Sequence, residues 1–94
     1  MTQEMANEIG NVVCSALGYT LVSVNVNVDK FNDKWFDLYC NIRETLNFLD
    51  ITEGCDGKAD VVNKKLQEMY EDKFKNIFCY DFGKRSIILE VLEY

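Results

Sequence analysis

Valine at every second position from residue 22 to residue 28 is the feature that most constrains this fold. The four valines alternate with Ser23, Asn25 and Asn27. Successive side chains of a β-strand point to opposite faces, whereas the same spacing on a helix would place the valines on two sides. We therefore predict a strand over residues 19–28, with one apolar face for a core and one polar face.

A second alternating segment follows the short polar turn at residues 29–34. In residues 35–42, one set of alternating positions is apolar and holds Phe36, Leu38, Cys40 and Ile42. The other set is mixed and holds Trp35, Asp37, Tyr39 and Asn41. Two such segments joined by a short turn are typical of an antiparallel hairpin. The sequence therefore predicts that the two polar faces lie side by side.

The N-terminal segment has helical periodicity, because apolar side chains recur every three or four positions over residues 2–17. Thr2 is a suitable N-cap, and Gly18 can adopt the left-handed conformation that ends a helix. Gly10 lies within this helix, where glycine costs about 1 kcal/mol relative to alanine. Its presence suggests close packing at that point.

A second helix is predicted to begin at Asp56 or Gly57 and to reach about Lys73, with Phe74 on its apolar face. Opposite charges alternate along its other face at a spacing of four residues. Such a helix would bury one side and leave the charged side in water.

Three shorter segments complete the predicted fold. Residues 44–53 fit neither a clean period of two nor a long helix, so we predict a third strand and keep a short helix as the alternative. Residues 77–82 and 86–92 predict a last hairpin, with Gly83 at positive φ. The fold class is α+β: one domain over residues 1–94, in which two helices pack on one face of a mainly antiparallel sheet of four to five strands, in the order α-β-β-β-α-β-β. The valine stripe should be buried beneath the helices.

Charge and cysteine usage restrict the function. The net charge of −6 repels phosphate backbones and anionic lipids, so we expect no direct nucleic-acid binding and no membrane binding. The N-terminus has acidic residues before any basic one, unlike a secretory signal. We expect a cytoplasmic protein with buried free thiols rather than a secreted disulfide framework, because the cysteines are widely spaced: Cys14, Cys40, Cys55 and Cys79.

Motifs for chemistry are lacking in the sequence. The chain has no histidine, which removes the commonest general base and metal ligand, and its five glycines form no phosphate-binding loop. The oxygen-rich stretch at residues 50–60 does not match the ligand spacing of an EF-hand. We therefore predict no catalytic residues, no cofactor and no metal site. An enzyme with an unrecognised carboxylate or cysteine site is the least favoured alternative.

Two features point to binding. The mixed face of the first hairpin offers Trp35 and Tyr39, residue types enriched among interface hot spots, unless both pack under a loop or against the last hairpin. The acidic residues are concentrated, and a spaced row of carboxylates would resemble a phosphate backbone to a basic groove, unless they serve only solubility. The predicted partner-binding residues are Asp29, Asp33, Trp35, Asp37, Tyr39, Glu44, Asp50, Glu53 and Asp56.

In size, acidity and lack of catalytic residues, the chain resembles the small inhibitors that phages and mobile elements encode against host nucleases, anti-CRISPR proteins among them. The likeness is one of type, and it carries over no site residue. The sequence therefore predicts a non-enzymatic acidic protein-binding module, of the kind that blocks a nucleic-acid-binding protein or nuclease through its basic surface. The alternative is a small structural homodimer that pairs through the edge of the strand at residues 86–94.

Overall fold

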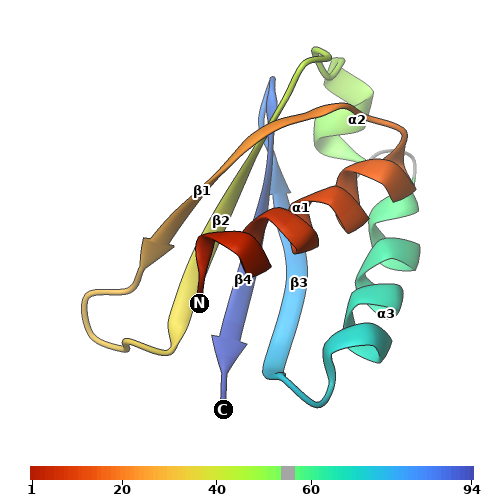
Figure 1. The fold of residues 1–94 in the computed structure, drawn as a ribbon. Coiled ribbons are helices and arrows are strands. Elements are labelled where there is room, and N and C mark those ends of the chain that lie inside the picture. Colours follow the sequence, from red (N-terminus) through yellow and green to blue (C-terminus); the bar gives the residue numbers. More distant parts are fainter. Residues whose placement is uncertain (54–56) are drawn as a thin grey trace.

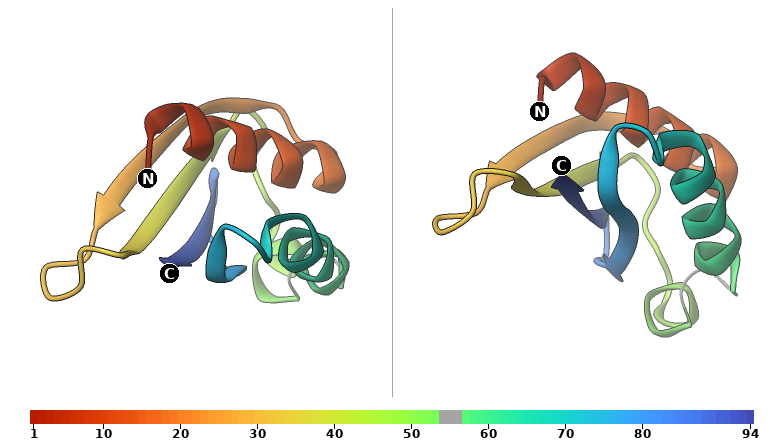
Figure 2. Two further views of the ribbon diagram at one scale, coloured as in Figure 1. Left: turned by 60° about the horizontal axis from the view of Figure 1, so that its bottom comes forward. Right: turned by 90° about the horizontal axis from the view of Figure 1, so that it is seen from below.

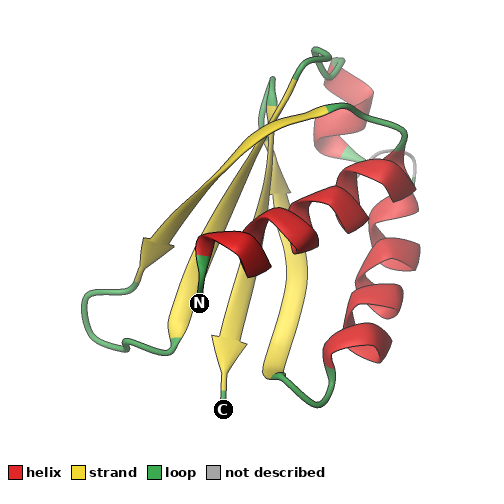
Figure 3. Cartoon of the chain, viewed as in Figure 1, coloured by secondary structure: helices red, strands yellow, loops and turns green. Residues whose placement is uncertain are grey.

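The computed structural model describes residues 1–53 and 57–94, and in them it has three helices and one four-stranded sheet (Figures 1 and 3). Neighbouring strands are antiparallel and follow the order β1-β2-β4-β3. The predicted α+β class is therefore confirmed, with four strands. The elements are α1 (Gln3–Leu17), β1 (Leu21–Val28), β2 (Trp35–Ile42), α2 (Phe48–Thr52), α3 (Lys58–Tyr70), β3 (Phe74–Phe82) and β4 (Ser86–Glu93).

The ends of α1 are those that the sequence predicts. The Thr2 hydroxyl accepts a hydrogen bond from the Met5 N–H at 3.1 Å. At the other end, Gly18 adopts φ 84°, and the Tyr19 N–H donates to the Cys14 carbonyl at 2.8 Å. Both terminal turns thus have partners for backbone groups that a helix leaves unpaired.

Gly10 brings α1 into close contact with the sheet. A Cβ atom at this position would lie 2.7 Å from Val24 Cγ2 and 3.4 Å from Cys40 Sγ. The first distance is shorter than carbon atoms tolerate, so the absence of a side chain permits this approach. The predicted close packing is confirmed.

The core lies between one face of the sheet and the helices. The right-hand view of Figure 2 shows α1 and α3 on the same side of the sheet, and α1 packs on β1 while α3 packs on β3. Leu38, Ile87 and Leu89 of the central strands have no solvent exposure, nor do Ile9 of α1 and Leu66 of α3. These buried apolar side chains belong to one cluster that stabilises the fold.

Residues 44–53 do not form the predicted third strand, and the short helix kept as the alternative is present at Phe48–Thr52. Residues 42–46 run along the tip of the β3–β4 hairpin, where the Leu46 N–H donates to the Lys84 carbonyl at 2.8 Å. The chain then turns into α2, because the Asn47 side chain accepts from the Asp50 N–H at 2.8 Å and caps the helix. Phe48 is 77% exposed, so an apolar residue here does not mark a buried strand.

The second helix is shorter than predicted. α3 begins after Gly57, as expected, but it ends at Tyr70, and Phe74 is the first residue of β3. The Phe74 ring still packs near the Tyr70 ring, with centroids 5.6 Å apart. The spacing of four residues between Tyr70 and Phe74 therefore indicated a real contact. The predicted helix was too long, because this contact spans the turn between α3 and β3.

The last hairpin turns without a positive φ at Gly83, contrary to the prediction. In the described residues, positive φ among glycines occurs at Gly18 and Gly57. The Gly83 N–H donates to the Ser86 carbonyl at 2.8 Å, and a Cβ at Gly83 would lie 2.5 Å from Ser86 Oγ. Glycine therefore provides space in this turn instead of an unusual backbone conformation.

The valine stripe of β1 is only partly buried, which corrects the prediction that it lines the core. Val24 is 4% exposed, whereas Val22 is 65% exposed and Val28 is 55% exposed. β1 lies at the edge of the sheet, and its register with β2 shifts between Leu21 and Ser23, which takes Val22 off the inner face.

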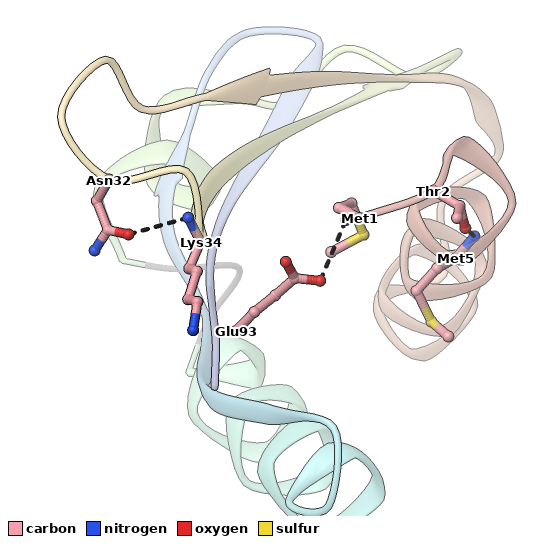
Figure 4. A network of polar contacts seen from close by, with 6 residues as sticks. All are labelled: Met1, Thr2, Met5, Asn32, Lys34 and Glu93. Carbon is pink, nitrogen blue, oxygen red and sulfur yellow. Dashed lines mark hydrogen bonds and ion pairs between the residues drawn. The ribbon is translucent and has the colours of Figure 1, made fainter.

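Polar contacts lie within the turn at residues 29–34 and between the end of β4 and the N-terminus (Figure 4). The Glu93 N–H donates to the Lys34 carbonyl at 2.8 Å, and the Lys34 N–H donates to Asn32 Oδ1 at 3.0 Å. Glu93 Oε2 also lies 3.2 Å from the Met1 amino group. The turn that leads into Trp35 is therefore joined to the end of β4, which is itself joined to the N-terminus.

Candidate protein-binding face

The side of the sheet opposite α1 and α3 is a polar and aromatic surface. In β2 and β4 every second residue is buried, and the residues between them are half-buried or exposed. We call these outward residues and their neighbours on β1 and β3 the open face. Its members are Ser23, Asn25, Asn27, Trp35, Asp37, Tyr39, Asn41, Asn76, Phe78, Tyr80, Ser86, Ile88, Glu90 and Leu92.

The two predicted aromatic anchors lie on this face beside aliphatic residues of β4. Trp35 is opposite Leu92, and Tyr39 is opposite Ile88. Trp35 is 41% exposed, and Tyr39 is half-buried. Each residue therefore lies beside the last hairpin and keeps part of its surface exposed. That this exposed surface binds a partner stays a prediction.

Two carboxylates face each other on the open face, towards the end of the sheet that carries the β1–β2 turn. Asp37 of β2 is directly opposite Glu90 of β4, and such pairs have Cβ atoms about 4.5–5.5 Å apart. β1, β2 and β4, which the structure describes in full, contain no lysine or arginine. Like charges in this arrangement destabilise a sheet. The pair therefore needs a cation that these strands do not supply.

Tyr80 of β3 completes the group. Its hydroxyl donates a hydrogen bond to Asp37 Oδ1 at 3.4 Å, and its ring meets the Phe78 ring edge to face, with centroids 6.3 Å apart. Burial, and then the negative charge of Asp37, raise the pKa of Tyr80 to about 12. The phenol therefore stays protonated at neutral pH and acts as a donor.

A hollow of about 350 Å³ opens on this face at the β1–β2 turn. Trp35 and Tyr80 supply aromatic rings, and Asp37 and Glu90 supply carboxylates. We call it the aromatic hollow. Its remaining lining residues are Asn27, Val28, Asp29 and Lys30.

Asp29 has a structural task at the rim of the aromatic hollow. Its Oδ2 atom accepts hydrogen bonds from the Phe31 N–H at 2.9 Å and the Asn32 N–H at 3.0 Å. This holds a turn in which Phe31 is 96% exposed and Asp33 is exposed. Asp29, Trp35, Asp37 and Tyr39 are thus brought to one region, with Asp33 in the adjoining turn.

The other predicted carboxylates lie near the opposite end of β2. Glu44 follows that strand, and the eight residues from Trp35 span about 25 Å at the usual rise per residue. Asp50 is in the first turn of α2, and Glu53 is its C-cap. Asp56 lies outside the described residues. The acidic residues therefore form two groups, one at each end of the sheet.

Glu44 is engaged within the protein. Its carboxylate accepts hydrogen bonds from the Thr20 N–H at 2.7 Å and the Thr20 hydroxyl at 2.8 Å. These bonds, the backbone one first, lower the pKa of Glu44. Its carboxylate thus joins the start of β1 to the segment after β2.

Sequence reasoning missed Tyr80 and Glu90. Alternation of Phe78 and Tyr80 with Ile77 and Cys79 was visible, but it did not indicate which strand would lie beside β2. The pairing of β2 with β4 joins residues about fifty positions apart, and this pairing brings Glu90 opposite Asp37. A local pattern carries no signal of such a contact.

The edges of the sheet differ from those expected. β4 is paired on both sides, with β2 and with β3, so it offers no free edge for a dimer. The edge strands are β1 and β3. At β1, Gln3 Nε2 donates to the Val24 carbonyl at 2.8 Å. At β3, both the N–H and the carbonyl of Cys79 bond to the Asn63 side chain.

Among residues 1–53 and 57–94, no group of three or more His, Cys, Asp or Glu side chains is placed to hold a metal ion; the acidic stretch at residues 50–60 falls partly outside this range. No helix in the described part of the chain has the length and apolar character needed to cross a membrane. No protein-family model, curated protein or solved structure matches the chain.

Proposed function

We propose that the protein is a non-enzymatic binding module that holds a basic segment of a partner protein on its open face. The observation that carries this proposal is the Asp37–Glu90 pair, which lines the aromatic hollow and lies on two strands, β2 and β4, that contain no lysine or arginine. Opposed carboxylates cost stability, and a cationic partner would turn this cost into attraction. Binding of a cationic partner is the best explanation for two surface carboxylates that repel each other.

The neighbouring rings fit this role. Trp35 and Tyr80 are 41% and 48% exposed, and Phe31 in the β1–β2 turn is 96% exposed. Tryptophan and tyrosine contribute strongly to protein interfaces, because each buries a large rigid surface at low entropic cost. The aromatic rings would supply most of the affinity, and the carboxylates would select a basic partner.

The biological role we propose is inhibition of the kind suggested by the sequence: a small phage-type protein that occupies the basic surface of a nucleic-acid-binding protein or nuclease. The partner-binding group comprises Trp35, Asp37, Tyr39, Tyr80 and Glu90. A reducing, cytoplasmic setting is part of the proposal, because the thiols of Cys14 and Cys40 are free and buried in the core.

Self-association is less well supported. In a face-to-face dimer the open faces would bring two Asp37–Glu90 pairs together, which adds repulsion. Pairing through an edge strand would compete with hydrogen bonds from Gln3 at β1 and from Asn63 at β3. Both routes to a homodimer therefore meet an obstacle.

Affinity capture with matched variants tests the proposal. The protein is immobilised and exposed to a nuclease-treated lysate, and proteins released by rising salt are quantified by mass spectrometry. Asp37→Asn/Glu90→Gln should lose basic partners at low salt, whereas Asp60→Asn/Glu68→Gln, with the same change of net charge on α3, should keep them. Equal losses in both double variants would overturn the proposal, because net charge alone would then explain the binding.

A further inference from the structure

We propose that the aromatic hollow receives one arginine side chain of the partner, with its guanidinium between the rings of Trp35 and Tyr80 and its N–H groups directed at Asp37 and Glu90. This inference rests on the proposed function and makes it specific. It concerns the identity of a single anchoring residue within the larger face.

The wall chemistry favours a guanidinium. A planar cation stacks on aromatic rings, and the indole of Trp35 and the phenol of Tyr80 offer such surfaces. Its five N–H groups match carboxylate oxygens in paired hydrogen bonds. The aromatic hollow offers both features together, since two rings and two carboxylates line the same space. An ammonium group has three donors around a point charge and makes less use of flat walls.

The size of the aromatic hollow suits a side chain. Its volume of about 350 Å³ lies near the lower end of the range for small-ligand pockets, about 300–1,000 Å³. The Tyr80 hydroxyl donates a hydrogen bond to Asp37 Oδ1, which orients this carboxylate and leaves its other oxygen for a partner. Glu90 lies opposite and supplies further acceptors.

Lys30 is the one basic residue among those that line the aromatic hollow. Within the described part of the chain, no ion pair joins Lys30 to Asp37 or Glu90. Neither carboxylate therefore has an ion-pair partner among the described residues, although Asp37 accepts the hydrogen bond from Tyr80. Removing the Lys30 charge should strengthen binding of an external arginine, because this charge opposes an incoming cation.

Three blocked peptides test the inference. Each has the sequence Gly-Ser-X-Ser-Gly with X as arginine, lysine or citrulline, the last being a neutral isostere of arginine. Trp35 is the sole tryptophan of the chain, so its indole N–H signal in a nitrogen-15 spectrum reports on the aromatic hollow without ambiguity. The arginine peptide should shift this signal and bind at least about tenfold more tightly than the citrulline peptide. Lysine should be intermediate.

Variants sharpen the test. Glu90→Gln and Asp37→Asn should each weaken the arginine peptide, Lys30→Gln should strengthen it, and Glu68→Gln on α3 should leave it unchanged. Dispersed amide spectra would show that each variant is folded. Equal binding of the three peptides, or arginine-induced shifts confined to the other end of the open face around Ser23 and Asn41, would overturn the aromatic hollow as an arginine site. If lysate capture still depended on Asp37 and Glu90, the proposed function would survive that result.

Discussion

Asn63 of α3 makes both outward backbone hydrogen bonds of Cys79 in β3: its Oδ1 accepts from the Cys79 N–H at 2.6 Å, and its Nδ2 donates to the Cys79 carbonyl at 3.1 Å. One side chain thus takes the place that another strand would occupy. Gln3 does the same for one carbonyl at the other edge of the sheet. Side chains from two helices therefore protect the two edges, where unpaired backbone groups promote association.

Replacing Asn63 should expose the edge of β3. Asn63→Ala leaves two part-buried backbone groups of Cys79 without this partner, and we expect the free energy of unfolding to fall by about 1–3 kcal/mol. Urea unfolding measures this change, and light scattering should detect more self-association. Lys64→Ala, at the next and exposed position, is the control. Equal stability of the two variants would contradict the role of Asn63.

Neutralising Glu90 should stabilise the isolated protein. Glu90→Gln removes the repulsion with Asp37 and should raise the free energy of unfolding by about 0.2–1 kcal/mol. The same variant should bind partners less well, which is the usual trade-off between stability and function. Glu68→Gln on α3 controls for net charge. A loss of stability in Glu90→Gln alone would show that the pair is not repulsive.

A methyl group at Gly10 should disturb the contact between α1 and β1. Gly10→Ala gains about 1 kcal/mol in helix propensity. It also forces a carbon atom to within 2.7 Å of Val24 Cγ2, and overpacking costs about 1–3 kcal/mol. We expect a net loss of about 1 kcal/mol in chemical unfolding. The loss should shrink in a Val24→Ala background, and strictly additive effects would argue against this contact.

Glu44 should make stability depend on pH. Its bonds to Thr20 lower its pKa below the ordinary value of 4.5, so the carboxylate stabilises the folded state above that pH. The contribution is lost as pH falls through the lowered folded pKa. Glu44→Gln should therefore melt at a lower temperature than the parent at pH 7, and the difference should shrink as the pH falls through the lowered folded pKa of Glu44. A constant difference across this range would rule out the proposed linkage.

The core thiols should resist modification. Burial raises the pKa of Cys14 to about 11 and that of Cys40 to about 12, so the reactive thiolate is scarce at pH 8. In a Cys55→Ser background, iodoacetamide should label the three remaining cysteines only after denaturation, as followed by mass spectrometry. Rapid labelling of one cysteine in the folded protein would instead support the alternative of a thiol enzyme.

Local signals predicted the parts of the fold that depend on near neighbours. Thr2 and Gly18 bound α1 because capping uses residues three or four positions away. The hairpin of β1 and β2 followed from alternation on both sides of a short turn. Residues 44–53 were predicted wrongly because Leu46 is buried while Phe48 is exposed, an order set by the hairpin tip that this segment crosses.

The candidate site was only half visible in the sequence. Trp35, Asp37 and Tyr39 lie on one strand, so their shared face was readable from alternation. Tyr80 and Glu90 reach them through the β2–β4 and β3–β4 pairings. Strand order depends on the global packing of the helices and sheet, which no local periodicity encodes. The concentration of acidic residues in the sequence also led to a wrong grouping. Glu44 and Asp50 were placed in one surface with Asp37, although they lie beyond the opposite end of β2.

Alternation along β2 and β4 separates two kinds of selective pressure. Residues such as Leu38 and Leu89 fill the core, while their immediate neighbours in sequence, such as Tyr39 and Glu90, face the other way. A lineage can therefore replace outward residues one at a time and acquire a new target while the core stays intact. The same property makes the sheet a convenient scaffold for randomised libraries, in which the varied positions and the fixed positions never share a side.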